Sequence, residues 1–178
     1  MFRNSIPPTE ERFMEDGALR RMIVRLFLRQ GEERHLVGFM KIYISPWPGK
    51  GSDFELTAHP IFQDGMIEAR LLNYAIITYP TVFRWTPSVV ISMVIDYNMF
   101  RHDYDNELPE ETSQRHIDLP RLRAHPRTTL ILNLMTERVR MYLSRVQRTM
   151  EYFGDEPKAM LHMTFRNSGA AYTERIHW

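Results

Sequence analysis

The clearest pattern along the chain is an alternation of apolar and polar residues between residues 20 and 45. Apolar side chains recur at every second position on one face, at Met22, Val24, Leu26 and Leu28. Residues 30–33 form a turn-like stretch before a second apolar run at residues 36–44, and this order predicts a β-hairpin. Three arginines spaced by four, at Arg21, Arg25 and Arg29, also fit a helix, so a helix over residues 21–29 remains the alternative.

Two longer stretches follow the three–four spacing that is typical of helices. Asp64 stands where a helix would be capped, and apolar residues recur through residues 66–79 until Pro80. The same spacing runs through residues 129–153 and predicts the longest helix of the chain. A strand over residues 138–146 is the alternative there, because apolar residues also alternate with polar ones.

Two further strands complete the predicted elements. Residues 88–97 are apolar enough for the centre of a sheet, and residues 158–166 predict a last strand. The fold class expected is α+β, with a mostly antiparallel sheet packed against two or three helices in one compact domain over residues 18–166. Proline and charge predict a flexible N-terminal arm at residues 1–17, a mobile loop at residues 101–127, and a C-terminal tail at residues 167–178.

Length and composition narrow the class of protein. The 178 residues are enough for one domain with a sizeable core. The absence of cysteine excludes disulfides, thiolate zinc sites and cysteine nucleophiles. The longest strongly apolar stretch, residues 89–95, is far shorter than the roughly 20 residues of a membrane span. The N-terminus lacks the pattern of a secretory signal, so we expect an intracellular, cytoplasmic protein.

Charge is unevenly distributed, although the net charge is only +1. Five acids and no base occupy residues 103–111, whereas residues 115–148 hold eight arginines against two acids. Such a stretch predicts a surface for anions, either phosphate backbones or anionic lipid headgroups. The pI of 8.1 lies below the value above 9 that is usual for nucleic-acid-binding domains, so a solvated helix face is the alternative. The candidate anion-binding residues are Arg115, Arg121, Arg123, Arg127, Arg138, Arg140, Arg145 and Arg148.

Candidate catalytic and metal-ligating residues are scattered. No two of the seven histidines have the helical spacing of a zinc site, and the acids after His102 lack the glycine and glutamate of a calcium loop. Positive charge near His116 and His125 disfavours their protonation. We therefore expect no catalytic residue, no metal and no cofactor. An enzyme would need a pocket that unites dispersed residues such as His102, Asp103 and His125.

The arm, the α+β domain and the charge segregation together resemble the matrix proteins of negative-strand RNA viruses, particularly the short ones of plant rhabdoviruses. The resemblance implies a non-enzymatic, self-associating structural protein that bridges an anionic membrane surface and a nucleocapsid or RNA, beneath the virion envelope. The arm departs from the matrix proteins of animal rhabdoviruses, since Pro7-Pro8-Thr9-Glu10 lacks the tyrosine of their budding motif. The alternative is a soluble nucleic-acid-binding accessory protein or adaptor. Candidate self-association residues are Phe2, Ile6, Pro7, Pro8, Trp47 and Trp178.

Overall fold

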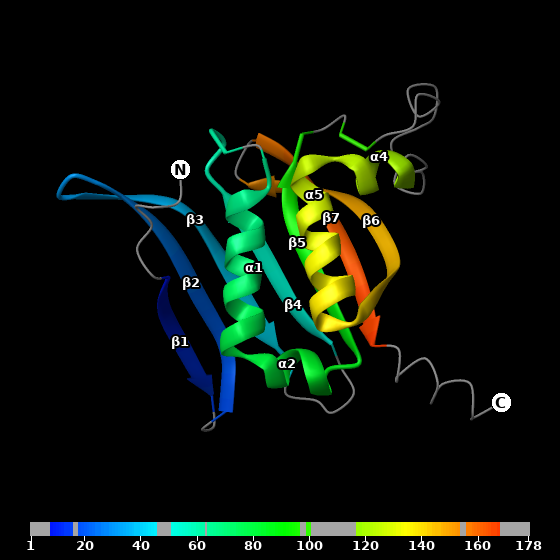
Figure 1. The fold of residues 1–178 in the computed structure, drawn as a ribbon, viewed down its shortest axis with the longest axis horizontal. Coiled ribbons are helices and arrows are strands. Elements are labelled where there is room, and N and C mark those ends of the chain that lie inside the picture. The colour runs from blue at the N-terminus through cyan, green and yellow to red at the C-terminus, as the bar shows by residue number, and fades with distance from the viewer. Residues whose placement is uncertain are drawn as a thin grey trace.

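The fold is a seven-stranded sheet with its helices on one face (Figure 1). The computed structural model describes residues 8–15, 18–45, 51–62, 64–96, 99–100, 117–153 and 156–167. The predicted α+β class, a single compact domain with a mostly antiparallel sheet, is confirmed. In the described part of the chain, no helix has the length and apolar character needed to cross a membrane.

The first half of the sheet is an antiparallel meander of four strands. These are β1 (Thr9–Glu15), β2 (Ala18–Gln30), β3 (Glu33–Ile44) and β4 (Ser52–Ala58). The predicted hairpin is confirmed as β2 and β3, because the alternate residues of β2 that include Val24 and Leu26 are fully buried. Residues 9–15 of the predicted arm form β1, so the ordered domain begins before residue 18.

Two helices carry the chain from β4 to the next strand. They are α1 (Met66–Thr78) and α2 (Pro80–Trp85), and they lead into β5 (Ser88–Ile95). Strand β5 lies parallel to β4, which requires a crossover of this kind because a tight turn reverses the chain. The helix predicted over residues 66–79 and the strand predicted over residues 88–97 are thus confirmed.

The second half adds three helical segments and two long strands. They are α4 (Leu119–Ala124), α5 (Pro126–Asn133), the π-helical η3 (Leu134–Val139), β6 (Met141–Phe153) and β7 (Glu156–Asn167). The helix predicted over residues 129–153 is wrong beyond Val139, and the strand alternative holds. Arg140 takes a left-handed φ of 64°, which ends the helix, and the alternating residues that follow pair with β7.

The mobile loop predicted over residues 101–127 is only partly within the described chain. Residues 119–124 form α4 and α5 begins at Pro126, so this portion is helical. Asp118 caps α4 by accepting the backbone N–H of Arg121 at 3.0 Å. Residues 101–116 lie outside the described residues.

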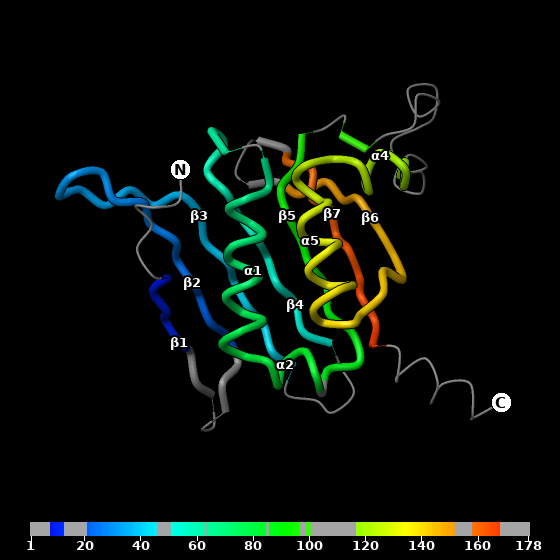
Figure 2. Tube along the Cα trace, viewed as in Figure 1, coloured from blue at the N-terminus to red at the C-terminus, as the bar shows by residue number. Residues whose placement is uncertain are grey.

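The strands are ordered β1-β2-β3-β4-β5-β7-β6, and β4–β5 is the parallel pair among antiparallel ones. Helices α1 and α5 lie side by side over the central strands, as the trace in Figure 2 shows. Their buried faces, with Ile67, Leu71 and Ile131, complete the core against the sheet. Helix α1 sits so close to β3 that a Cβ on Gly38 would lie 2.4 Å from the Ile67 side chain.

Candidate functional site

The parallel strands β4 and β5 part at their carboxyl ends. Their pairing runs from Ser52–Val89 to Leu56–Met93. Beyond it, Ala58 stays paired with β3, whereas Ile95 stays paired with β7. The crevice beyond the carboxyl ends of parallel strands, where neighbouring strands lead in opposite directions, is the common ligand position in open sheets. The gap between β4 and β5 is therefore the candidate site.

A small cavity lies at this gap. Its volume is about 120 Å³, which is below the roughly 300–1,000 Å³ of pockets for drug-sized ligands. It therefore has room for a few heavy atoms only. The side chains that bring polar chemistry to its wall are His59, Asp96 and Arg127. The lining residues are Leu56, Ala58, His59, Pro60, Phe62, Val94, Ile95, Asp96 and Arg127.

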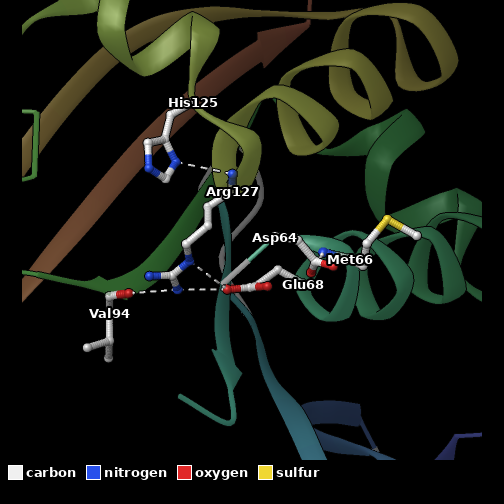
Figure 3. A network of polar contacts seen from close by, with 6 residues as sticks. All are labelled: Asp64, Met66, Glu68, Val94, His125 and Arg127. Atoms are coloured by element: carbon white, nitrogen blue, oxygen red, sulfur yellow. Dashed lines mark hydrogen bonds and ion pairs between the residues drawn. The ribbon is translucent and has the colours of Figure 1, made fainter. Parts of the chain in front are cut away.

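Arg127 is held across the gap by a buried ion pair (Figure 3). Its Nη2 donates to Glu68 Oε1 at 2.7 Å and to the Val94 carbonyl oxygen at 2.9 Å, and its Nε donates to Glu68 Oε1 at 3.2 Å. These bonds tie α5 to α1 and β5. They engage Nε and Nη2, whereas Nη1 makes no such bond with the residues that the structure describes. Glu68 is fully buried, and its Oε2 has no hydrogen-bond partner in the described part of the chain.

The start of α5 fixes the position of Arg127. Pro126 occupies the first helical position, where its missing N–H is not needed. The ring of His125 caps the helix, because its Nδ1 accepts the Arg127 backbone N–H at 3.2 Å. Burial lowers the pKa of His125, and the positive charge of Arg127 lowers it further against the opposing effect of Asp96. The predicted suppression of His125 protonation is confirmed.

The start of α1 is contacted by Asp64 and by the backbone of α5. Asp64, predicted as a cap, accepts the Met66 backbone N–H at 3.0 Å, while Gly65 occupies the cap position itself with a φ of 77°. A Cβ on Gly65 would lie 2.6 Å from Arg127 Cα and 2.7 Å from the Pro126 carbonyl oxygen. The backbone of α5 therefore leaves no room for a side chain at Gly65.

A larger recess adjoins the cavity beneath the tip of the β2–β3 hairpin. Its volume is about 680 Å³, and it shares His59 and Phe62 with the cavity. The two rings lie edge to face at 6.4 Å, and His59 Nδ1 accepts the Ile61 backbone N–H at 3.3 Å. The recess is lined by Leu28, Arg29, Gln30, Arg34, His35, Leu36, Val37, His59, Ile61 and Phe62.

A third hollow of about 440 Å³ lies between α1 and the α5–η3 segment. It shares no lining residue with the cavity or the recess. Its walls are largely apolar, and Arg138 at its edge donates to Asn73 Oδ1. This outer groove is thus separate from the gap between β4 and β5.

A serine–histidine contact on the other face of the sheet does not form a nucleophilic triad. Ser92 Oγ lies 2.7 Å from His162 Nδ1, and His162 Nε2 lies 2.7 Å from Thr149 Oγ1. The ring thus contacts two hydroxyl groups, where a triad would have a carboxylate to orient it. Burial lowers the pKa of His162 against the opposing effect of Glu151 and two further acids. Among the described residues, no group of three side chains could hold a metal ion.

The arginines predicted to bind anions are dispersed over several elements. Arg127 and Arg148 are buried, and Arg121 pairs with Asp118 at 3.5 Å. The others described lie exposed on α4, at or just after the end of η3, and on β6: Arg123, Arg138, Arg140 and Arg145. Arg115 is outside the described residues. The described arginines therefore do not form one continuous surface.

The other predicted site residues are mostly outside the described chain. This applies to His102 and Asp103, and to the self-association candidates Phe2, Ile6, Pro7, Trp47 and Trp178. Pro8 is half-buried directly before β1. The role of these residues in self-association stays a prediction.

Sequence reasoning missed Glu68, Asp96 and His59. A usable signal was present for Asp96, because it ends the strongest predicted strand, where site residues of parallel strands gather.

Comparison with known proteins gives structural neighbours only. No family model matches the chain, and no curated protein matches its sequence. An acetyltransferase from Sphaerobacter thermophilus is similar with a TM-score of 0.41 and 10% identity over 83% of this chain and 70% of that one. Mutant forms of the spermidine/spermine N-acetyltransferase SpeG from Vibrio cholerae have a TM-score of 0.40 and 9% identity, over 85% of this chain and 70% of that one. An aminoglycoside 6'-N-acetyltransferase complexed with coenzyme A has a TM-score of 0.35 and 15% identity, over 80% of this chain and 72% of that one.

The predicted resemblance to viral matrix proteins is contradicted, because the structures that are similar to this chain are acetyltransferases. The prediction of a non-enzymatic structural protein in virions is wrong, and so is its nucleic-acid-binding or adaptor alternative. Arms, charge segregation and an α+β domain are shared by many unrelated proteins, so this outline did not discriminate between them. At TM-scores below 0.5 the likeness assigns neither activity nor substrate, which must come from the chain's own residues.

Proposed function

We propose that the chain is an acyl-transfer enzyme that passes a small acyl group to an amine at the gap between β4 and β5. One observation carries the proposal. The parallel strands part beyond Leu56 and Met93, and the cavity between them holds a fixed guanidinium and a carboxylate. Its volume of about 120 Å³ suits a group of the size of acetyl or propionyl. Acetyl transfer to an amine is also the activity by which two of the similar structures are named.

Arg127 supplies the positive charge that this reaction needs. Attack on an acyl carbonyl places negative charge on its oxygen, and donors fixed beforehand stabilise that charge best. The bonds to Glu68 and Val94 hold the guanidinium still. In our proposal, Nη1 donates to the carbonyl oxygen of the acyl group in the cavity.

Asp96 supplies a base in the same cavity. It is exposed at the end of β5, so an incoming amine can reach its carboxylate. The amine nitrogen forms a bond to the carbonyl carbon while its proton passes to Asp96. The bond from that carbon to the donor's leaving group then breaks, and the leaving group departs with the electron pair.

Coenzyme A is the acyl carrier that the fold family implies, and its diphosphate does not fit this chain. A diphosphate at a helix start needs free backbone N–H groups and favourable charge. At α1, the Met66 N–H is taken by Asp64 and the α5 backbone is packed on Gly65. No lysine or arginine occurs in residues 59–69, which contain two acids. No step is therefore assigned to coenzyme A, and the donor is taken as an activated acyl group.

The test is amine acylation by the purified protein from short donors without a diphosphate, such as S-acetyl-N-acetylcysteamine, with the product followed by mass spectrometry. We expect repeated turnover, and a loss of at least about 100-fold in kcat for Asp96→Asn, because positioned bases contribute about 10²–10⁴-fold. Asp53→Asn is the matched control, since Asp53 is a carboxylate on the opposite face of β4. Absence of turnover with every donor, or equal loss in both variants, would exclude the proposal.

A further inference from the structure

Two arginines line the recess beneath the hairpin tip. Arg29 of β2 and Arg34 of β3 are directly opposite in the antiparallel register, and both are exposed. Like charges in directly opposite positions destabilise a strand pair. The nearest acid along β3, Glu33, lies 3.4 Å from the ring of His35. Within the described residues, neither arginine has an acidic partner.

The lining of the recess is correspondingly basic. It contains these two arginines and two histidines, but no aspartate or glutamate. Its remaining walls are mainly apolar, with Leu28, Val37 and Phe62 among them. A volume of about 680 Å³ falls within the roughly 300–1,000 Å³ that is typical of small-molecule sites. The recess thus combines the size of a ligand site with a lining that holds two arginines and no acid.

The recess also adjoins the proposed reaction site. His59 and Phe62 line both the recess and the cavity between β4 and β5. A small molecule bound in the recess can therefore extend one end past these two residues. That end would meet the carboxylate of Asp96, which lines the cavity.

We propose that the recess is the acceptor site and that the acceptor amine carries an oxyanion group, a carboxylate or a phosphate, bound between Arg29 and Arg34. This inference rests on the proposed acyl transfer and names its substrate class. Paired guanidinium groups fit planar carboxylates and phosphates through two parallel hydrogen bonds. The bound oxyanion relieves the repulsion between the arginines. A polycation such as spermidine would be repelled by the same pair.

The test measures binding directly by isothermal titration calorimetry, independently of turnover. The probes are the dipeptide Glu-Glu and phosphoethanolamine. The counterparts are the dipeptide Gln-Gln with an amidated C-terminus, which carries no carboxylate, and the polycation spermidine. We expect Glu-Glu or phosphoethanolamine to bind more tightly than both counterparts, and the tighter of the two identifies the oxyanion. Arg34→Gln should weaken that binding at least about tenfold, because a hydrogen bond to a charged group is lost.

A matched control and a second readout separate binding from general damage. Arg25→Gln removes an arginine of the same strand that pairs with Glu11 at 2.7 Å, away from the recess, and it should leave the affinity unchanged. Without ligand, Arg34→Gln should raise Tm, because it removes the opposed like charge. Arg25→Gln removes an ion pair instead and should not raise it.

The outcomes distinguish this inference from the proposed function. Tighter binding of spermidine or Gln-Gln, or unchanged affinity in Arg34→Gln, overturns the acceptor class even if acyl transfer is found. Selective, Arg34-dependent binding of the acidic probes without any acyl transfer supports the oxyanion site and overturns the acyl-transfer assignment. If spermidine is acylated and the acidic amines are not, the acyl-transfer function stands and the inferred acceptor class is wrong.

Discussion

At the scale of single residues, the Glu68–Arg127 pair is the most consequential interaction. Both side chains are buried, and Glu68 Oε2 lacks a partner in the described chain, so desolvation offsets much of their attraction. Apolar residues of similar size could occupy these positions without losing stability. The pair therefore serves to fix the guanidinium at the gap between β4 and β5.

Glu68→Gln should destabilise the protein by about 3–5 kcal/mol, because it leaves the buried Arg127 charge uncompensated. The measurement is urea denaturation, followed by circular dichroism. The double variant Glu68→Leu, Arg127→Met is the comparison, and we expect it to be near wild-type stability yet unable to transfer acyl groups. A loss below about 1 kcal/mol in Glu68→Gln would show that the pair is not buried as described.

His125 makes folding stability depend on pH. Its folded pKa is lowered from 6.5, chiefly by burial, so the unfolded chain binds more protons near that pH. The contribution of neutral His125 to folding stability is fully present above about pH 6.5, and it is lost as pH drops towards the folded pKa. The pKa of His162 is also lowered, so His162 adds a pH dependence of the same direction that a His125 variant would keep.

His125→Asn keeps a cap acceptor for α5 and removes this titration. We expect a shallower fall in Tm between about pH 7 and pH 5 than in the wild type, measured by thermal denaturation across that range. If Tm fell with pH equally steeply in the variant and the wild type, His125 would not be held neutral as the cap of α5.

At the scale of elements, the junction between η3 and β6 decides where helix becomes strand. Arg140 holds a φ of 64°, a conformation that costs a residue with a Cβ about 1–2 kcal/mol. Its side chain is exposed, so the backbone conformation and not packing governs substitution.

Arg140→Gly should therefore raise the free energy of unfolding by up to about 1 kcal/mol, and Arg140→Val should lower it. Chemical denaturation of both variants measures the difference. If glycine proved the less stable of the two, the left-handed junction would be refuted.

The elements differ in how far their sequences reveal them. The β2–β3 hairpin and β5 were predictable, because period-two patterns and a turn act locally. Residues 141–153 satisfy both helical and strand periodicity, and only pairing with β7 makes them a strand. Strand β1 is rich in charge because it lies at the sheet edge, so it lacked the apolar alternation that identifies a strand.

At the scale of the whole molecule, the sequence could not predict which residues meet in the candidate site. His59 follows β4, Asp96 follows β5, and Arg127 begins α5, so their meeting depends on the strand order. The arginine-rich stretch was noticed as charge, yet Arg127 is buried against an acid 59 residues away. Composition records how many charges a chain has, whereas the fold decides which of them meet.

The two strands that part at the gap, β4 and β5, belong to halves of the sheet that are synthesised one after the other. Strand β4 belongs to a meander of neighbouring hairpins that can pair while the ribosome is still adding later residues, whereas β5 must be followed by β6 and β7 before its other edge is covered. The nascent chain thus exposes the open edge of β4 until the second half arrives. The gap that holds Asp96 and Arg127 therefore needs residues from both halves of the chain. A chain truncated before residue 127 would retain the hairpin arginines but lack the guanidinium at the gap.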